Sequence, residues 1–250
     1  MSESYKESFE KTKKAGEIAA GALDEVSKII KPGIQTDKID KLCYEYINDN
    51  GAYSAPLFYR GFPKSCCTST NHIVCHGIPS SKILRDGDIV NVDVTALKDG
   101  WHGDTSRTYE IGEVSVKAKK LVKTTFDAMM KAIKIIKEDV FLGDIGATIQ
   151  NHVEAEGFSV VQDFCGHGIG RHFHQEPNVL HYGKKGTGER IKAGMIFTIE
   201  PMINFGKYET KTLNDGWTAV TKDKSLSAQF EHTIGVTKDG YEIFTLSKQQ

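Results

Sequence analysis

Apolar residues recur at helical spacing in four segments of the chain, which predicts four amphipathic helices. Residue types that end helices follow them, including Lys31-Pro32-Gly33 after the first segment and Gly157 after the last. Thr36 is an expected N-cap for the second helix, which Asn50-Gly51 closes. The expected helices cover residues 5–30, 36–50, 116–137 and about 144–156.

Two segments between these helices are rich in β-branched residues, a composition that favours strands. They are Ile89–Leu97 and Met195–Ile199. Helical and strand segments follow one another without a Pro- or Ser-rich linker between them. We therefore expect a mixed α/β (α+β) fold in a single domain that covers residues 1–250.

The same two strand segments belong to an internal repeat. Residues 34–51 match residues 140–157 at a constant offset of 106 positions. Leu84–Asp93 matches Ile191–Glu200 at an offset of 107 positions. Any two amphipathic helices resemble each other, but an offset that is almost unchanged from helix to strand favours a duplication.

The repeat predicts two related halves, roughly residues 1–112 and 113–250. In each half the matched strand ends on a carboxylate, Asp93 in the first and Glu200 in the second. Two halves that face each other would therefore form a central cleft with one acid on each side.

Composition and charge exclude several classes of protein. The 250 residues have a formal net charge of −1, so bulk charge does not indicate binding to nucleic acid or to an anionic membrane. The N-terminal sequence is polar and no run of about 18 apolar residues occurs, so neither a secretory signal nor a membrane span is expected. Five cysteines without a C-x-x-C pair argue against a disulfide framework and predict a reducing cytoplasm.

The first candidate for chemistry is a pair of acids, Asp93 and Asp104, that flank the turn-like sequence Lys98-Asp99-Gly100. A hairpin there would place the two acids at opposing positions of paired strands, about 5 Å apart at Cβ. The valines around Asp93 indicate a buried strand, where two like charges repel strongly. A divalent cation would neutralise them.

The second half offers further ligands of the same kind. Glu200 ends one apolar strand segment, and Glu231 lies within another strand-like segment. His167 stands between two glycines, which predicts a constrained turn with unusual dihedral angles. Four carboxylates and one imidazole suit a pair of Mn, Fe, Co or Zn ions, held about 3.5–4 Å apart by bridging carboxylates.

These ligands lie in motifs that resemble the methionine aminopeptidases of the short bacterial type, and the resemblance extends from the first helix to Phe244. The order and spacing of the motifs together make the resemblance specific. They are residues 74–79 (VCHGIP), 87–94 (GDIVNVDV), 102–105 (HGDT), 165–170 (CGHGIG), 197–202 (FTIEPM) and 227–233 (SAQFEHT).

The resemblance implies a pita-bread fold, with an antiparallel sheet, flanking helices and pseudo-twofold halves. It implies removal of the initiator methionine from new polypeptides. Its five metal ligands fall on Asp93, Asp104, His167, Glu200 and Glu231. In the family pattern Asp104 and Glu231 bridge two metal ions, Asp93 binds one ion, and His167 and Glu200 bind the other.

The family pattern also implies residues that contact the substrate. Glu200 would move a proton from the attacking water to the leaving amine. His174 would donate a hydrogen bond to the substrate amide, and His76 would contact the peptide beside the scissile bond. The methionine pocket would be formed by Tyr59, Phe62, Cys67, Phe173 and Trp217.

The chain departs from the common bacterial pattern at Pro56, where a cysteine is frequent, and at Arg60, where a histidine is frequent. Both positions belong to the expected pocket rim. The family further implies peptide or nascent-chain N-termini as substrates, contact with the ribosome, and a monomer.

Three alternatives remain open at this stage. A related Xaa-Pro dipeptidase or aminopeptidase shares the metal ligands, although such relatives usually have an additional N-terminal domain. A non-catalytic relative that binds partners would be expected to lack metal ligands. A cysteine hydrolase could use Cys165 near His167, but the sequence offers no third residue to orient such a pair.

Overall fold

The computed structural model describes residues 5–247 of the chain, and within them four α-helices enclose a set of antiparallel strands. The helices are α1 (Lys6–Ile29), α2 (Thr36–Asp49), α3 (Val116–Lys134) and α4 (Leu142–Ala155). The strands of the first half are β1 (Tyr53–Ser54), β2 (Cys67–Thr70), β3 (Ile73–Cys75), β4 (Ile89–Lys98) and β5 (Trp101–Glu110). A 3-10 turn, η2 (Tyr59–Gly61), lies between β1 and β2.

The second half contains shorter strands in larger number. They are β6 (Ser159–Val160), β7 (Gly166–Gly168), β8 (Gln175–Val179), β9 (Ile196–Ile199), β10 (Met202–Asn204), β11 (Thr210–Thr212), β12 (Ala219–Thr221), β13 (Ser227–Gln229), β14 (His232–Val236) and β15 (Tyr241–Ile243). A five-stranded sheet has the order β15-β14-β9-β7-β8, and β4 lies between β1 and β2 in another sheet that also includes β5. Three-stranded sheets with the orders β13-β10-β6 and β11-β12-β3 complete the set.

The four predicted helices are confirmed, with corrections at their ends. Thr36 is the first helical residue and not the N-cap, because its hydroxyl donates to the Ser80 carbonyl and accepts from the Ser80 N–H instead. The fourth helix begins at Leu142, since the Asp144 carboxylate accepts a hydrogen bond from the Phe141 N–H within its first turn. The third helix ends at Lys134, three residues before the predicted end.

The hairpin predicted around Asp99-Gly100 is formed by β4 and β5, but its register differs from the prediction. Asp93 pairs with Ser106 and Asp104 pairs with Thr95, so the two acids are diagonal and not directly opposite. The prediction was wrong because only two residues, Asp99 and Gly100, separate the strands. Positions two apart on a strand share a face, so both acids still point to the same side of the hairpin.

Backbone hydrogen bonds repeat between the two halves. The Leu84 N–H donates to the Ile34 carbonyl at 2.8 Å, and 107 positions later the Ile191 N–H donates to the Val140 carbonyl at 2.7 Å. Helices α2 and α4 each contain 14 residues and occupy matching places in their halves. The same local fold therefore occurs twice, while the boundary near residue 112 stays a prediction.

Hydrogen bonds between β5 and the region of β14 join the halves. The Asp104 N–H donates to Thr233 Oγ1 at 3.0 Å, and that hydroxyl donates to the Asp104 carbonyl at 2.7 Å. The Glu231 N–H donates to the Ser106 carbonyl at 3.1 Å, and Thr105 Oγ1 donates to the Glu231 carbonyl at 2.7 Å. These bonds place an acid from each half at the centre of the molecule.

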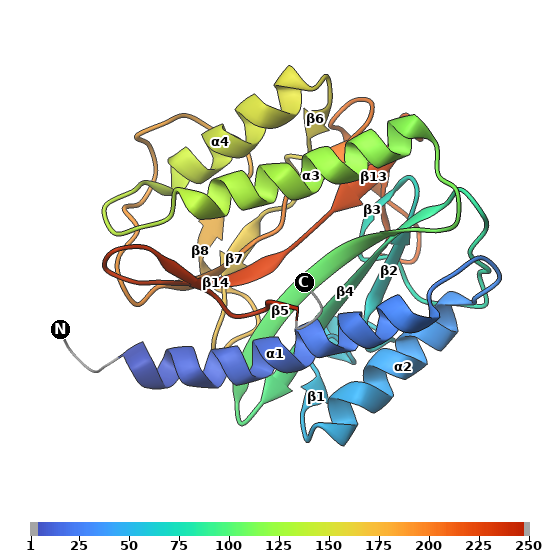
Figure 1. Ribbon diagram of the computed structural model, residues 1–250, viewed down its shortest axis with the longest axis horizontal. Coiled ribbons are helices and arrows are strands. Elements are labelled where there is room, and N and C mark those ends of the chain that lie inside the picture. The colour runs from blue at the N-terminus through green and yellow to red at the C-terminus, as the bar shows by residue number, and fades with distance from the viewer. Residues whose placement is uncertain (1–4, 248–250) are drawn as a thin grey trace.

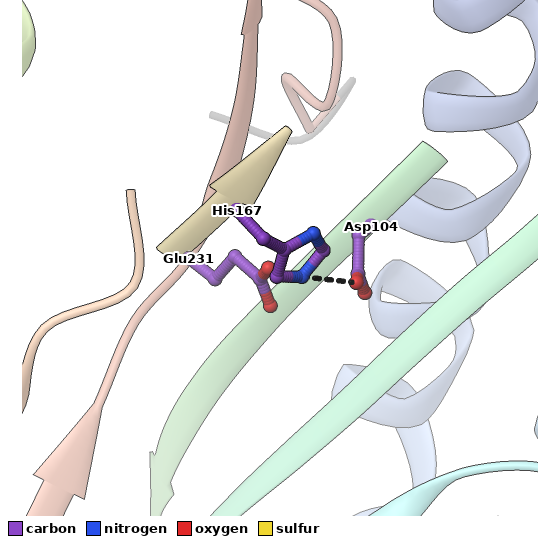
Figure 2. Close-up of side chains that lie close together, drawn as sticks. All are labelled: Asp104, His167 and Glu231. Carbon is purple, nitrogen blue, oxygen red and sulfur yellow. Dashed lines mark ion pairs between the residues drawn. The ribbon is translucent and has the colours of Figure 1, made fainter. Parts of the chain in front are cut away.

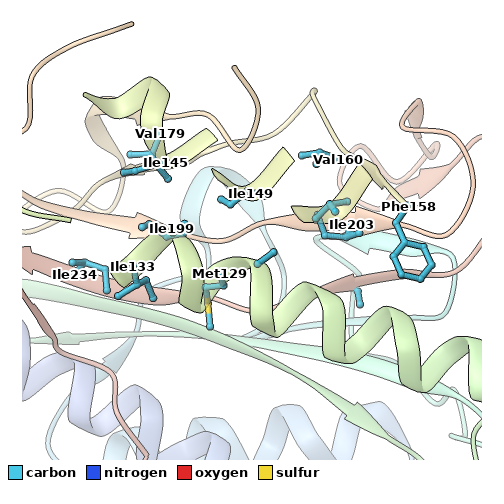
Figure 3. Close-up of a cluster of buried hydrophobic side chains, with 14 of the residues drawn as sticks. Met129, Ile133, Ile145, Ile149, Phe158, Val160, Val179, Ile199, Ile203 and Ile234 are labelled. Atoms are coloured by element: carbon cyan, nitrogen blue, oxygen red, sulfur yellow. The ribbon is translucent and has the colours of Figure 1, made fainter. Parts of the chain in front are cut away.

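Each half has its own apolar core beneath its helices. In Figure 1, α1 and α2 lie along the strands of the first half, and α3 and α4 lie along those of the second half. One cluster packs α1 and α2 against β4 and β5, with Leu23, Ile39 and Val92 fully or almost fully buried. The second packs α3 and α4 against the strands of the second half, with Met129 and Ile149 at its centre (Figure 3). Burial of these faces is the main contribution to stability.

None of the helices within residues 5–247 is both long and apolar enough to span a membrane.

The close approach of α1 to β5 requires a glycine at position 103 of β5, and this contact generates a prediction. A Cβ at Gly103 would lie 2.2 Å from the Gly16 backbone nitrogen, so Gly103→Ala would force the helix away from the strand. Overpacking of this kind costs about 1–3 kcal/mol. We expect a lower midpoint in thermal and urea unfolding. Gly240→Ala is the matched control, because its Cβ would meet no atom closer than 3.9 Å. Equal stability of the two variants would contradict this reading of the contact.

Candidate metal centre and substrate pocket

The five predicted metal ligands line a single cavity of about 370 Å³. Asp93 comes from β4, Asp104 from β5 and His167 from β7, while Glu200 follows β9 and Glu231 precedes β14. Figure 2 shows the side chains of Asp104, His167 and Glu231 turned toward one another, and their potential ligand atoms all lie within 4.8 Å. The structure therefore brings together residues that are as far apart in the sequence as Asp93 and Glu231.

His167 lies in strand β7 and not in the turn predicted from its flanking glycines. Gly166 and Gly168 serve close approach instead of unusual dihedral angles: a Cβ at Gly168 would lie 2.1 Å from the Glu176 carbonyl oxygen, and one at Gly166 would lie 2.4 Å from the Thr198 carbonyl oxygen. His167 Nδ1 lies 3.1 Å from the Gly168 carbonyl, to which it can only donate. The lone pair of Nε2 therefore remains available to a ligand.

The imidazole faces the carboxylates with this nitrogen. His167 Nε2 lies 3.5 Å from Glu200 Oε1 and 3.7 Å from Asp104 Oδ2. Asp93 and Glu231 line the same cavity. One imidazole nitrogen and several carboxylate oxygens thus converge on a common space.

Three polar residues that the sequence analysis did not single out hold these acids in place. Thr95 Oγ1 donates to Asp104 Oδ1 at 2.7 Å, Thr198 Oγ1 donates to Glu200 Oε1 at 2.8 Å, and Gln229 Nε2 donates to Glu200 Oε2 at 3.2 Å. Each of the three stands two positions from one of the four acids. Strand periodicity was therefore a signal that could have identified them.

His181 is a further residue to which the sequence suggested no role. It is fully buried, and its Nε2 accepts a hydrogen bond from the Glu200 N–H at 3.2 Å. This bond fixes the backbone at Glu200, just after β9 ends. Nothing in the local sequence pattern distinguishes His181 from a surface histidine, because the contact depends on the folding of distant segments.

Burial shifts the pKa of every candidate ligand toward the uncharged form. It raises the pKa of Asp93 to about 7 and that of Glu200 to about 8. Burial, followed by repulsion from neighbouring carboxylates, raises the pKa values of Asp104 and Glu231 well above their ordinary range. Burial also lowers the pKa of the His167 imidazole to about 4. The protein alone thus does not compensate the charges that these groups would carry at neutral pH.

A divalent cation fits what the site lacks. Glu231 Oε1 is buried without a hydrogen-bond partner in the part of the chain that the structure describes. Buried carboxylate oxygens are normally paired, and a cation would both pair with this oxygen and offset the mutual repulsion of the acids. Oxygen-rich donors with one imidazole suit Mn, Fe, Co or Zn.

The two histidines predicted to contact substrate lie in the same cavity. The ring centroids of His174 and His167 are 4.2 Å apart, and His174 Nδ1 lies 3.0 Å from the Tyr59 hydroxyl. His76 packs edge to face against Phe164 and adopts a left-handed backbone conformation, with φ of 55°. Non-glycine residues in this conformation are uncommon and often occur at functional sites.

All five residues predicted for the methionine pocket also line this cavity. Phe62 and Cys67 are buried, and the Phe62 ring packs edge to face on Trp217 at a centroid distance of 5.2 Å. Tyr59 packs on Phe173 at 4.9 Å. The cavity thus has an apolar, largely aromatic wall beside the acids.

Cys165 lines the cavity as well, which bears on the cysteine-hydrolase alternative. Burial raises the pKa of its thiol. A nucleophilic cysteine requires the opposite shift, because the thiolate is the reactive form. The surroundings of Cys165 therefore do not favour this alternative.

Comparisons with known proteins agree with the site. The sequence pattern of metallopeptidase family M24 matches residues 10–238. The methionine aminopeptidase of Rickettsia prowazekii is 56% identical over 243 residues, which cover 97% of this chain and 94% of that protein. The methionine aminopeptidase of Escherichia coli K12 is 52% identical over 244 residues, which cover 97% of this chain and 92% of that protein.

The fold is shared with solved structures. The crystal structure of methionine aminopeptidase from Rickettsia prowazekii matches with a TM-score of 0.95 at 55% identity, over 96% of this chain and 98% of that one. The prolidase from Pyrococcus furiosus, at 22% identity, shares the fold with a TM-score of 0.78 but is matched over only 65% of its own length. The predicted pita-bread fold is confirmed, and the chain belongs to metallopeptidase family M24.

Proposed function

We propose that this chain is a methionine aminopeptidase, which removes the initiator methionine from new polypeptides by hydrolysis assisted by two divalent metal ions. The observation that carries the proposal is the group of four carboxylates and one imidazole that line one cavity, beside a wall that is apolar and largely aromatic. The relatives that match almost the whole chain bear this name, which supports the same activity here.

Asp93, Asp104, His167, Glu200 and Glu231 are the residues that would hold the metal ions. The family pattern makes Asp104 and Glu231 the shared ligands, and their buried, mutually repelling carboxylates support that role. When bound, such ions lower the pKa of a water molecule and polarise the carbonyl of the scissile peptide bond. This donor set suits Mn, Fe, Co or Zn.

Glu200 is the proposed proton carrier of the reaction. Its carboxylate would take a proton from the attacking water and pass it to the amine that leaves. Thr198 and Gln229 each hold one of its oxygens, and His181 holds its backbone N–H. Such restraint favours proton transfer, because the carboxylate needs no large movement between taking the proton from water and giving it to the leaving amine.

His174 would donate a hydrogen bond to the oxygen that gains negative charge. Burial, then the nearby His167 and His76, lower its pKa to about 3, so its imidazole is neutral at pH 7. If the Tyr59 hydroxyl donates to Nδ1, the proton of the neutral ring lies on Nε2, which is then the donor toward substrate. His76 would contact the peptide next to the scissile bond.

The methionine side chain would occupy the wall formed by Tyr59, Phe62, Cys67, Phe173 and Trp217. An unbranched thioether adapts to such a wall and makes favourable contacts with aromatic rings. The buried positions of Phe62 and Cys67 would exclude water from this side of the substrate.

The alternatives receive less support. The prolidase from Pyrococcus furiosus and a dipeptidase from Mycobacterium ulcerans share the fold, but each is only 22% identical to this chain. The match covers 65% of the first protein and 58% of the second. A non-catalytic relative has no need for a complete set of buried ligands. Cytoplasmic residence, a monomeric state and contact with the ribosome are part of the proposal, and the five free cysteines support the first of these.

Metal-dependent release of methionine tests the proposed function. Chelator-treated protein is incubated with Met-Ala-Ser or with an Xaa-Pro peptide, with Mn, Fe, Co or Zn added in turn, and free amino acids are measured. We expect methionine from Met-Ala-Ser only when metal is present.

Asp104→Asn should reduce this activity by about 100-fold or more, because a shared ligand is lost. Asp99→Asn, an exposed acid in the turn of the same hairpin, is the control and should retain activity. Cleavage of the Xaa-Pro peptide alone would reject the proposed substrate.

The role of His174 generates a second prediction. His174→Ala should lower kcat by about 10²–10³-fold with a smaller change in KM, since the lost hydrogen bond acts mainly on the transition state. His172→Ala is the matched control, because His172 is exposed and lines a separate cavity beside Trp101. Comparable kcat values for the two variants in steady-state assays would exclude the proposed role.

A further inference from the structure

The cavity has a closed end and an open mouth. Phe62 and Cys67 are only 3% and 7% exposed, and they line the closed end. Arg60 and Asp163 line the same cavity but are exposed, so they mark its mouth. A peptide whose methionine fills the apolar end must leave the cavity past these two side chains.

The backbone around Arg60 is held in an uncommon conformation. Phe58 and Arg60 have φ of 65° and 47°, and Gly61 has φ of 88°, so three residues of this short turn are left-handed. The Phe58 N–H donates to the Phe62 carbonyl at 2.8 Å, and the Phe62 N–H donates to the Tyr59 carbonyl at 2.9 Å. Non-glycine residues rarely adopt this conformation unless the surroundings require it. In this left-handed turn, the adjacent residues Tyr59 and Arg60 both line the cavity.

Tyr59 connects Arg60 to the reacting end of the site. The Arg60 guanidinium carbon lies 5.3 Å from the centroid of the Tyr59 ring, and the Tyr59 hydroxyl contacts His174 Nδ1 at 3.0 Å. The guanidinium therefore lies near the place where the peptide continues beyond the scissile bond.

Among residues 5–247, no carboxylate forms an ion pair with Arg60. The other exposed charge at the mouth, Asp163, accepts a hydrogen bond from Thr210 Oγ1 at 2.5 Å. A guanidinium is always charged and offers several donors in a planar arrangement that matches a carboxylate.

We propose that Arg60 selects peptides that present a carboxylate downstream of the N-terminal methionine. The inference rests on the proposed function, because it adds a preference to the same site. The carboxylate can belong to an aspartate or glutamate side chain a few residues after the methionine, or to the C-terminus of a short peptide. Both present the same chemistry to the guanidinium. Arg60 is thus a residue that determines specificity and takes no part in bond cleavage.

Two pairs of peptides distinguish a side-chain carboxylate from a C-terminal carboxylate. The first pair is Met-Ala-Asp-Asp-Ser and Met-Ala-Asn-Asn-Ser, both with amidated C-termini, which differ only in side-chain charge. The second pair is Met-Ala-Ser with a free or an amidated C-terminus. We expect kcat/KM to be about two- to fivefold higher for the charged member of at least one pair, the size of an exposed charge contact. This ratio should fall toward one in 0.5 M KCl, because salt screens exposed charges.

Substitutions of Arg60 test whether this residue causes the preference for a carboxylate. Arg60→Gln should bring the ratio to one, Arg60→Lys should retain part of it, and Arg60→Glu should reverse it. Arg85→Gln is the matched control, because Arg85 is exposed and does not line the cavity, and it should keep the wild-type ratio. Equal cleavage within both pairs, or a ratio that survives in both Arg60→Gln and Arg60→Glu, would overturn the inference. Failure to release methionine from any peptide would instead reject the proposed function.

Discussion

The burial of four carboxylates in one cavity is the constraint on which the rest of the structure depends. Asp93, Asp104, Glu200 and Glu231 lose hydration together, and their pKa values rise because burial disfavours the charged form and, for Asp104 and Glu231, because neighbouring carboxylates repel them. Thr and Gln donors satisfy some of their oxygens, but one Glu231 oxygen has no partner in residues 5–247. Divalent cations bound there would complete this arrangement, which would link the electrostatics of the fold directly to its chemistry.

The architecture serves this cavity by bringing two similar halves together along their strands. Hydrogen bonds between Asp104 and Thr233, and from the Glu231 N–H to the Ser106 carbonyl on β5, hold acids of both halves at fixed positions. A slip of one residue in the β4–β5 register would turn either Asp93 or Asp104 to the opposite face, into the core beneath α1, and so separate the two acids. The close contact between Gly16 and Gly103 contributes to the same precision, since it holds α1 against the strand that carries Asp104.

Much of this arrangement could be predicted from the sequence, because it depends on local periodicity. Helical spacing identified the four helices, and the repeat offset identified equivalent strands that end on Asp93 and Glu200. The exact pairing of Asp104 could not be predicted, since it depends on how many residues the turn uses. The role of His181 and the left-handed turn at Arg60 depend on contacts between distant segments, and no local pattern reveals them.

The central claim is that the five converging side chains hold two divalent cations, and anomalous X-ray scattering from crystals grown with Mn²⁺ tests it most directly. The account predicts two anomalous peaks about 3.5–4 Å apart between Asp104 and Glu231, one beside Asp93 and the other beside His167 and Glu200. The same crystals of Glu231→Gln protein should lose at least one peak. Well-ordered crystals of the wild-type protein with no anomalous peak in this cavity, or with peaks only at the surface, would contradict the account.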